Sequence, residues 1–291
     1  MNNIGILYTC FNRKNKTIES LNSLYKSFNN LNKQVEFDIF LTDDGSTDGT
    51  SDAVKNNFPE VNILSGSGNL FWANGMINSW EEALLKKYDG YLLLNDDTLL
   101  YEHCISQLLL THEYSIKKNK KEGIYIGATE DKNTNKLTYS GSILLNKFLY
   151  TQKRLIPNNN FQHCDLANAN IMLVSHKVVE KIGILSSGYE HGIADYDYTL
   201  TASKKNIPVI IAPRYCGHCE NDHVDLYDGF LDKTIEERKN ILHSPTKMAF
   251  KSNIKYMRKF FPLRLPLYVF FGYFKIYFPK IYLKYFRNVR R

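Results

Sequence analysis

The sequence predicts an α/β protein with a mainly parallel central sheet, helices on both faces of that sheet, and a helical C-terminal tail. Three observations carry this prediction. Short apolar runs alternate with stretches of helical periodicity through the first hundred residues, as in consecutive strand, helix and strand units. Several of the apolar runs end in polar loops. After residue 237 the acidic residues stop, while aromatic and basic residues continue.

The composition is that of an ordinary globular protein. The chain has 291 residues, of which 43% are hydrophobic and 23% charged. These values exclude a disordered chain, a collagen and a small disulfide scaffold. The length suits one large domain or two small ones, since one core usually serves about 100–200 residues. Five cysteines without framework spacing and the lack of a basic, apolar leader predict a cytoplasmic protein without a signal peptide.

The first hundred residues contain most of the predicted sheet. Apolar runs bounded by polar turns indicate strands, and apolar side chains at helical spacing indicate helices. The expected elements are strands at residues 4–9, 35–42, 61–64 and 91–94, and helices at 17–28, 51–57 and 75–88. Ligands of such sheets bind at the carboxyl ends of the strands. The loops after the first, second and fourth strands are therefore expected to line one crevice.

The second half of the chain is expected to add strands and one helix. The expected elements are strands at 123–128, 136–145, 169–174 and 209–212, a helix at 177–182, and a polar stretch around 191–198. No internal repeat or low-complexity linker divides the chain. The change in composition, together with Ser244-Pro245, predicts a boundary between a domain of residues 1–245 and a C-terminal region of residues 246–291.

Acidic pairs follow two of the predicted strands. Asp43 and Asp44 follow the second strand, and Asp96 and Asp97 follow the fourth. Carboxylates placed there can hold Mg²⁺ or Mn²⁺ against the phosphates of a ligand. Each pair taken alone is equally well explained as a solvated acidic turn. Their expected position in one crevice is what predicts a site.

The segment Thr42-Asp43-Asp44-Gly45-Ser46-Thr47-Asp48, followed at a distance by Asn95-Asp96-Asp97, resembles the family 2 glycosyltransferases of the Rossmann-like GT-A fold. Their signatures are Asp-Asp-Gly-Ser-x-Asp and a metal-binding Asp-x-Asp. The resemblance covers about residues 3–245 and is to the kind, rhamnosyltransferases included, that builds bacterial surface polysaccharides such as capsule and O-antigen. It implies an inverting enzyme that moves a sugar from a nucleoside-diphosphate donor to a hydroxyl, with Mn²⁺ or Mg²⁺ as cofactor.

The resemblance also implies roles for individual residues in donor and metal binding. The implied donor-nucleotide contacts are Thr9, Asn12, Arg13, Asp44, Asn69, Asn95 and Asp96. The implied metal ligands are Asp97 and His218, with His223 as the next candidate. Phe71 stands where the family's Gly-Asn-x-Gly segment more usually has a glycine, so the shape of the donor pocket is expected to differ. A UDP or dTDP sugar is the favoured donor.

Asp195 occupies the position of the catalytic base in the family resemblance. The segment Ala194-Asp195-Tyr196-Asp197 stands where the family usually reads Glu-Asp-x-Asp. A hydroxyl is a poor nucleophile until a carboxylate takes its proton, and this is the role implied for Asp195. The implied acceptor contacts are Trp72, Asn170 and His191. Trp72 is equally well explained as an anchor of the helix that follows it, and Asn170 by turn geometry before a strand.

Other interpretations stay open at this point. Cys216-Gly217-His218-Cys219 has the residue types of a redox dithiol or of half a zinc site, although it lacks the sequence context of either. A nucleotide-binding scaffold that has lost catalysis is an alternative function, for which Ala194 and Phe71 are the arguments. A sugar nucleotidyltransferase is a second alternative. It is expected to begin with a Gly-rich loop, and residues 5–16 contain a single glycine.

The C-terminal tail combines positive charge with aromatic residues. The first 237 residues contain 23 Lys and Arg and 30 Asp and Glu, a net charge of −7, whereas fourteen Lys and Arg and no carboxylate follow. Fourteen of the chain's 17 Phe and 20 Tyr residues also lie after residue 237. No run reaches the roughly 20 apolar residues that cross a bilayer. An acidic body disfavours nucleic acid as a partner.

The tail is therefore expected to form an interfacial helix, with its rings at headgroup depth and its basic residues near anionic lipid. This places the enzyme in the cytoplasm, peripheral at the inner face of the bacterial cell membrane, with a glycan or lipid-linked saccharide as acceptor. A self-packing or dimer-forming helical subdomain is the alternative.

Overall fold

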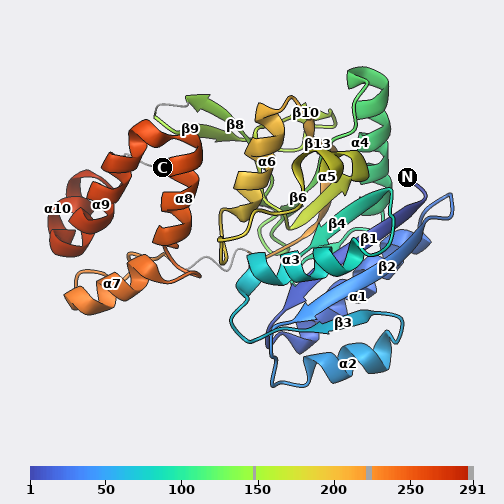
Figure 1. Ribbon diagram of the computed structural model, residues 1–291, viewed down its shortest axis with the longest axis horizontal. Coiled ribbons are helices and arrows are strands. Elements are labelled where there is room, and N and C mark those ends of the chain that lie inside the picture. The colour runs from blue at the N-terminus through green and yellow to red at the C-terminus, as the bar shows by residue number, and fades with distance from the viewer. Residues whose placement is uncertain (147–148, 221–224, 288–291) are drawn as a thin grey trace.

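The computed structural model describes residues 1–146, 149–220 and 225–287 (Figure 1). Its main sheet consists of β1 (Asn3–Cys10), β2 (Glu36–Asp43), β3 (Asn62–Ser65), β4 (Gly90–Leu94), β5 (Leu99–Leu100), β6 (Ile124–Glu130), β7 (Leu137–Tyr139), β10 (Gln162–His163), β12 (Ile171–Ser175) and β13 (Val209–His218). The strand order is β10-β13-β6-β12-β4-β1-β2-β3, with β5 beside β13 and β7 beside β6.

The main sheet is parallel through its N-terminal half and mixed beyond it. The neighbours β4, β1, β2 and β3 all run parallel, as do β6 and β13. Strand β12 runs antiparallel to both β4 and β6. The predicted α/β class with a mainly parallel sheet is confirmed. The carboxyl end of β4 meets the start of β12, so segments far apart in sequence lie side by side there.

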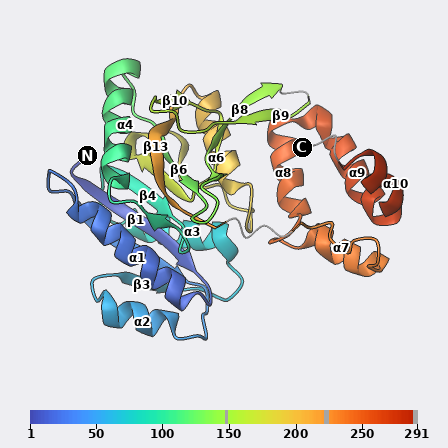
Figure 2. The ribbon, with the colours of Figure 1, turned by 180° about the vertical axis from the view of Figure 1, so that it is seen from behind.

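Helices cover both faces of this sheet. One face carries α1 (Lys14–Asn29), α2 (Thr50–Asn57) and α4 (Cys104–Asn119), and the other carries α3 (Phe71–Ala83), α5 (His176–Ile182) and α6 (Ala194–Lys204). Alternate strand residues serve the two faces: Ile6 packs in the cluster with Leu21 and Leu24, and Leu7 in the cluster with Met76 and Trp80. Figure 1 shows α3 and α6 in front, and Figure 2 shows α1 and α4 from behind.

Three predictions of local structure need correction. Residues 136–145 do not form one strand: β7 pairs with β6, and β8 (Gly141–Asn146) joins β9 (Thr151–Arg154) and β11 (Leu166–Ala167) in a second, antiparallel sheet. The chain changes sheets at Gly141, where an added Cβ would lie 2.6 Å from the Cys164 sulfur. Helix α4 was not predicted, although Ile105, Leu108 and Leu109 have helical spacing. The polar stretch around 191–198 contains the start of helix α6.

The C-terminal tail folds into short helices instead of one long interfacial helix. They are α7 (Ile235–His243), α8 (Phe250–Phe260) and, after a 3₁₀ turn at Pro262–Arg264, α9 (Leu265–Tyr277) and α10 (Pro279–Tyr285). Prolines at 262, 266 and 279 each stand in the first two positions of a new helical segment. Proline is tolerated there but interrupts a helix further in. No helix among the described residues has both the length and the apolar character needed to span a membrane.

Helices α7 to α10 form one C-terminal helical unit at the end of the molecule opposite α4 (Figures 1 and 2). Its core cluster contains Phe230, Ile241, Leu242, Phe250 and Ile276. Because α7 shares this core, residue 245 falls inside the unit, and we propose that the domain boundary lies before α7. Helix α8 also packs on the α/β domain, in a cluster that contains Ala73, Leu166, Tyr189, Ala194, Leu200, Tyr256, Met257 and Phe261.

Candidate active site

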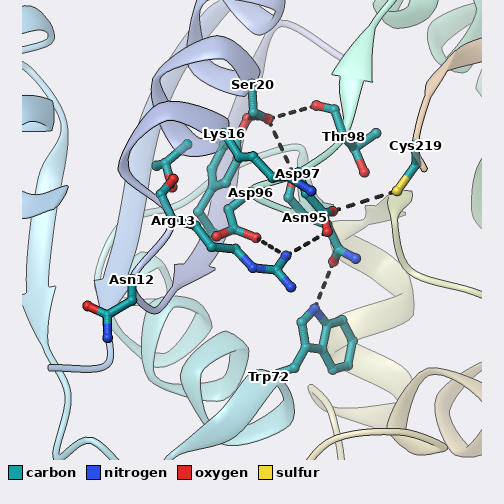
Figure 3. Close-up of polar contacts among 12 residues, drawn as sticks. Asn12, Arg13, Lys16, Ser20, Trp72, Asn95, Asp96, Asp97, Thr98 and Cys219 are labelled. Carbon is teal, nitrogen blue, oxygen red and sulfur yellow. Dashed lines mark hydrogen bonds and ion pairs between the residues drawn. The ribbon is translucent and has the colours of Figure 1, made fainter. Parts of the chain in front are cut away.

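The loop after β4 is fixed by contacts from three other elements (Figure 3). The Asn95 backbone N–H donates to the carbonyl oxygen of Asn170 at 3.2 Å, which joins this loop to the start of β12. Trp72 of α3 donates its indole N–H to Oδ1 of Asn95 at 2.8 Å. From α1, Ser20 donates to the carbonyl oxygens of Asn95 and Thr98. Trp72 thus anchors the Asn95 side chain, and its predicted contact with the acceptor stays a prediction.

The carboxylates of Asp96 and Asp97 in this loop pair with Arg13, which lies in the loop before α1 (Figure 3). Nη1 of Arg13 lies 2.6 Å from Oδ2 of Asp97 and 3.3 Å from Oδ1 of Asp96. Burial raises the pKa of Asp96 to about 7, although Arg13 acts in the opposite direction. Oδ2 of Asp96 is buried without a hydrogen-bond partner within the described ranges. The pair binds a positive group and retains an unused oxygen, which suits a divalent cation.

The end of β13 brings Cys219, and not His218, to Asp97. The Cys219 sulfur lies 3.7 Å from Oδ1 of Asp97 and 3.5 Å from Nδ2 of Asn170. Nδ1 of His218 instead lies 3.3 Å from the Tyr101 hydroxyl. Consecutive residues of an extended chain point to opposite sides, so the two cannot both face Asp97. Across the described residues, no three His, Cys, Asp or Glu side chains gather as a metal site, and His223 lies outside the described residues.

Cys216 of β13 and Cys219, which follows that strand, do not form together the alternative sites considered above. Cys216 is fully buried in the core cluster that contains Cys104, whereas Cys219 lies beside Asp97. No disulfide joins any of the five cysteines, and all five are buried. Burial raises the pKa of the Cys219 thiol to about 12, with the Asp97 charge acting in the same direction. A thiol that holds its proton so firmly is a poor redox nucleophile.

The Asp-Asp-Gly-Ser loop is tied to the loop before α3 through Asp44. One oxygen of Asp44 accepts the backbone N–H of Gly68 at 2.8 Å, and the other accepts those of Leu70 at 2.8 Å and Phe71 at 3.0 Å. Phe71 has a φ of 54°, the left-handed conformation that favours glycine. The segment therefore keeps the backbone shape of the glycine that the resemblance led us to expect. Asn69 is exposed within this loop.

Two other residues predicted to contact the donor nucleotide, Asn12 and Thr9, contact neighbouring elements of the protein. The Asn12 backbone N–H donates to Oγ of Ser46 at 2.8 Å, and Oδ1 of Asn12 accepts the N–H of Thr47 at 2.7 Å. Asn12 thus turns toward the Asp-Asp-Gly-Ser loop and away from the carboxylates (Figure 3). Thr9 packs under α3, where a Cβ added to Gly75 would lie 2.1 Å from its Oγ1. Asn12 thus joins two loops at this end of the sheet, and Thr9 packs β1 against α3.

Asp195 lies in the first turn of α6 and contacts the segment before β12. Its Oδ1 accepts the backbone N–H of Tyr196 at 2.8 Å, and its Oδ2 accepts that of Ala169 at 3.3 Å. Burial raises the pKa of Asp195 to about 6, while these bonds and the Asn168 side chain lower it. The residue after Ala169 is Asn170, whose carbonyl accepts from Asn95. Residues 168–170 therefore form a wall that Asp195 and the carboxylate loop share.

The loop before α6 approaches the same region. The carbonyl of Glu190 accepts the N–H of Ala73 at 3.1 Å, which holds the exposed His191 near the start of α3, next to Trp72. Ala194, where the resemblance led us to expect Glu, is fully buried in the apolar cluster with α8. A Glu at this position would bury a charge among apolar side chains. Alanine fits this apolar surrounding, which α8 helps to form.

The model of glycosyl transferase family 2 matches residues 6–177, which is more than half of the chain and includes both acidic motifs. The chain belongs to this family. It is accordingly a nucleotide-sugar-dependent glycosyltransferase, and the predicted GT-A fold is confirmed. The matched segment ends just after β12, so the family match includes the Asn170 wall but not Asp195 or the C-terminal helical unit. No curated protein matches the chain.

Solved glycosyltransferase structures share this fold at low sequence identity. The S. aureus TarS structure of residues 1–349 is 15% identical with a TM-score of 0.51, covering 86% of this chain and 68% of that one. The same segment has been solved in complex with UDP. The Pyrobaculum calidifontis mannosyltransferase PcManGT, in complex with GDP-Man and Mn²⁺, is 11% identical with a TM-score of 0.55, covering 94% of this chain and 70% of that one. At these identities the likeness establishes the fold alone.

Proposed function

We propose that this family 2 enzyme is an inverting, metal-dependent glycosyltransferase that extends a bacterial surface glycan on a lipid-linked acceptor. The observation that carries the proposal is the wall of residues 168–170. It bonds Asp195 at Ala169 and the Asn95 loop at Asn170. A donor diphosphate over Asp97 and an acceptor hydroxyl over Asp195 then lie on one surface, as a single displacement requires.

The donor side is the crevice between β1, β2 and β4. Arg13, Asp96 and Asp97 are proposed to hold the diphosphate and its cation, with Asn95 toward the ribose. A divalent ion bound by the carboxylates supplies charge that stabilises the leaving diphosphate. We keep UDP and dTDP sugars as the favoured donors, and TarS has been solved with UDP. GDP is included among the nucleotides to test, because PcManGT has been solved with GDP-Man and Mn²⁺.

Asp195 is proposed as the base on the acceptor side. Its carboxylate takes the proton of the acceptor hydroxyl while that oxygen attacks the anomeric carbon from the face opposite the diphosphate. One displacement of this kind inverts the anomeric configuration. Trp72, Asn170 and His191 are proposed to hold the acceptor sugar.

The C-terminal helical unit is proposed to bring the enzyme to its lipid-linked acceptor. Exposed apolar side chains gather on its last two helices and the turn before them: Leu263, Leu267, Phe270, Tyr273, Tyr277, Phe278, Ile281 and Tyr285. Exposed Lys280 and Lys284 lie among them. Aromatic rings at headgroup depth with lysines near anionic lipid describe a peripheral membrane surface. The proposed location is the cytoplasmic face of the cell membrane.

The donor site is tested by thermal unfolding with UDP, dTDP, GDP and CDP, each with and without Mn²⁺. A ligand that binds only the folded state raises the unfolding temperature by mass action. We expect one nucleotide to stabilise the enzyme, and to do so more strongly with Mn²⁺. Stabilisation that Mn²⁺ does not change would contradict metal dependence. The lack of any stabilisation by all four nucleotides would contradict the proposed donor site.

A further inference from the structure

A second acidic residue of α6 lies buried two positions after Asp195. The Asp197 side chain is 1% exposed. It accepts hydrogen bonds from Oγ of Ser186 at 2.8 Å and from the Tyr189 hydroxyl at 2.7 Å. A carboxylate removed from water to this degree needs a cationic partner. The position of Asp197, and with it the acceptor side of the site, therefore depends on the element that supplies this cationic partner.

The partner is Lys259, at the end of α8 in the C-terminal helical unit. Its Nζ lies 2.8 Å from each carboxylate oxygen of Asp197 and 3.0 Å from Oγ1 of Thr201, one turn further along α6. Asp197 and Lys259 are 62 residues apart in the sequence. An ion pair with both oxygens engaged fixes the direction of the carboxylate as well as its charge.

Helix α8 makes further contacts with the segment before α6. Lys255, one helical turn before Lys259 and on the same face, lies over the Tyr189 ring at 4.6 Å and donates to the carbonyl of Ser187. Tyr256 and Met257 pack in the cluster that contains Ala194, the residue before Asp195. Ile193, which packs on this cluster, has a φ of 74°. A β-branched residue is strained in that conformation and keeps it only where packing imposes it.

We propose that Lys259 is a positioning residue of the transfer reaction, which holds Asp195 at the crevice through Asp197 and the first turn of α6. This inference rests on the proposed role of Asp195. The first turn of a helix has backbone N–H groups without helical partners, so α8 supplies the rigidity that this turn lacks by itself. Lys255 and Lys259 then contact the acceptor side of the site. The lysines proposed to face lipid are others of the same helical unit, Lys280 and Lys284.

The test compares Lys259→Met, which removes the charge, with Lys259→Arg, which keeps it. Lys251→Met, at an exposed position of the same helix, is the matched control. The assay follows nucleoside diphosphate released from a pool of UDP, dTDP and GDP sugars with Mn²⁺ and a total bacterial lipid extract. We expect Lys259→Met to lower kcat about 10- to 100-fold, since a base displaced by about 1 Å loses that much. Nucleotide affinity should stay within twofold, and Lys259→Arg should recover part of kcat.

A double-mutant cycle separates positioning from general stability. Asp197→Asn removes the carboxylate, so Lys259→Met should add little to the loss when it is combined with Asp197→Asn. Fully additive losses would overturn the proposal. So would an unchanged kcat in Lys259→Met, or a loss of kcat that comes with an equal loss of nucleotide affinity. If Asp195→Asn retains transfer, the base assignment itself fails. If Asp195→Asn is inactive while Lys259→Met equals the wild type, only the positioning role fails.

Discussion

Asp195 shows how its surroundings prepare a carboxylate for proton transfer. Burial raises its pKa to about 6, which makes it a stronger base than a solvated aspartate. Only the ionised form accepts a proton, so kcat should rise with pH up to about 6 and level off above it. The measurement is a pH profile of kcat at saturating donor and Mn²⁺, so that the donor site stays filled. A flat profile between pH 4.5 and 8 would count against Asp195 as the base.

Replacing the same residue separates chemistry from donor binding. Asp195→Asn keeps the shape of the side chain but cannot accept the proton, and we expect transfer to fall about 100-fold or more. Nucleotide affinity should be unchanged, because the carboxylate of Asp195 bonds to Asn168, Ala169 and Tyr196, none of which is a proposed donor contact. Kinetics and calorimetric nucleotide binding measure the two effects. Asp52→Asn, at an exposed position of α2, is the control and should retain full activity.

Arg13 is expected to compete with the metal for the Asp96 and Asp97 carboxylates. Its guanidinium pairs with both, although 44% of the side chain is exposed. Arg13→Ala should tighten Mn²⁺ binding in the absence of nucleotide and weaken nucleotide binding in its presence, since the diphosphate loses a cationic contact. Electron paramagnetic resonance of free Mn²⁺ gives the affinity, with Lys14→Ala as the control. Weaker Mn²⁺ binding in Arg13→Ala would refute this competition.

The individual residues of the site differ in how far the sequence predicts them. Asp97, Asn95 and Asp195 belong to local motifs that the family resemblance identifies, and the structure brings their loops together. The contacts of Arg13 with Asp97 and of Lys259 with Asp197 join residues 84 and 62 positions apart. Each lysine or arginine of the chain is an equally good partner until the fold selects one.

At the scale of elements, Gly272 lets two helices of the C-terminal helical unit approach. An added Cβ there would lie 2.3 Å from Cε2 of Phe250, so Gly272→Ala must displace the ring. We expect a net loss of about 1–3 kcal/mol in the free energy of unfolding, because overpacking outweighs the roughly 1 kcal/mol by which alanine favours a helix. Thermal unfolding measures it. Gly192→Ala, whose added Cβ meets open space, should change little; an increase in Tm for Gly272→Ala would contradict the packing argument.

Elements with a single strong pattern are predictable from this sequence. The buried strands β1 and β4 are short apolar runs, and both lie close to the expected residues. Strand β13 is harder, since its pairing with β6 shifts register between Ile211 and Tyr215 and again before Gly217. Such irregularities change which face a side chain takes. The family resemblance implied His218 as a metal ligand, and the sequence alone could not show that the structure brings Cys219 to Asp97.

At the scale of the whole molecule, the exposed aromatic residues gather at one end, together with exposed lysines. The C-terminal helical unit carries most of the exposed rings at one end of the molecule (Figure 1). We expect the enzyme to sediment with vesicles of anionic lipid and to be released by salt, which screens the lysine contacts. The double variant Phe270→Ser and Phe278→Ser should lose this binding, because each ring is more than half exposed.

The control for vesicle binding is Leu85→Ser, an exposed apolar position just after α3, far from these helices in sequence. It should sediment like the wild type. If the double variant still binds vesicles, the aromatic surface is not the lipid contact. If the variant instead has half the mass of the wild type in solution by light scattering, the surface joins two copies of the chain, and the dimer alternative is correct.

The contact between α8 and α6 has a consequence for how the enzyme is made. The loop that carries Asp97 contacts Asn170 and Cys219, so the proposed donor side is complete only after β13 has been made. The position proposed for Asp195 depends on Lys259, which lies later still in the chain. A nascent chain therefore completes its proposed donor side before its proposed acceptor side. On this proposal, transfer cannot begin until α8 has folded against α6, and α8 belongs to the same helical unit that is proposed to meet the membrane.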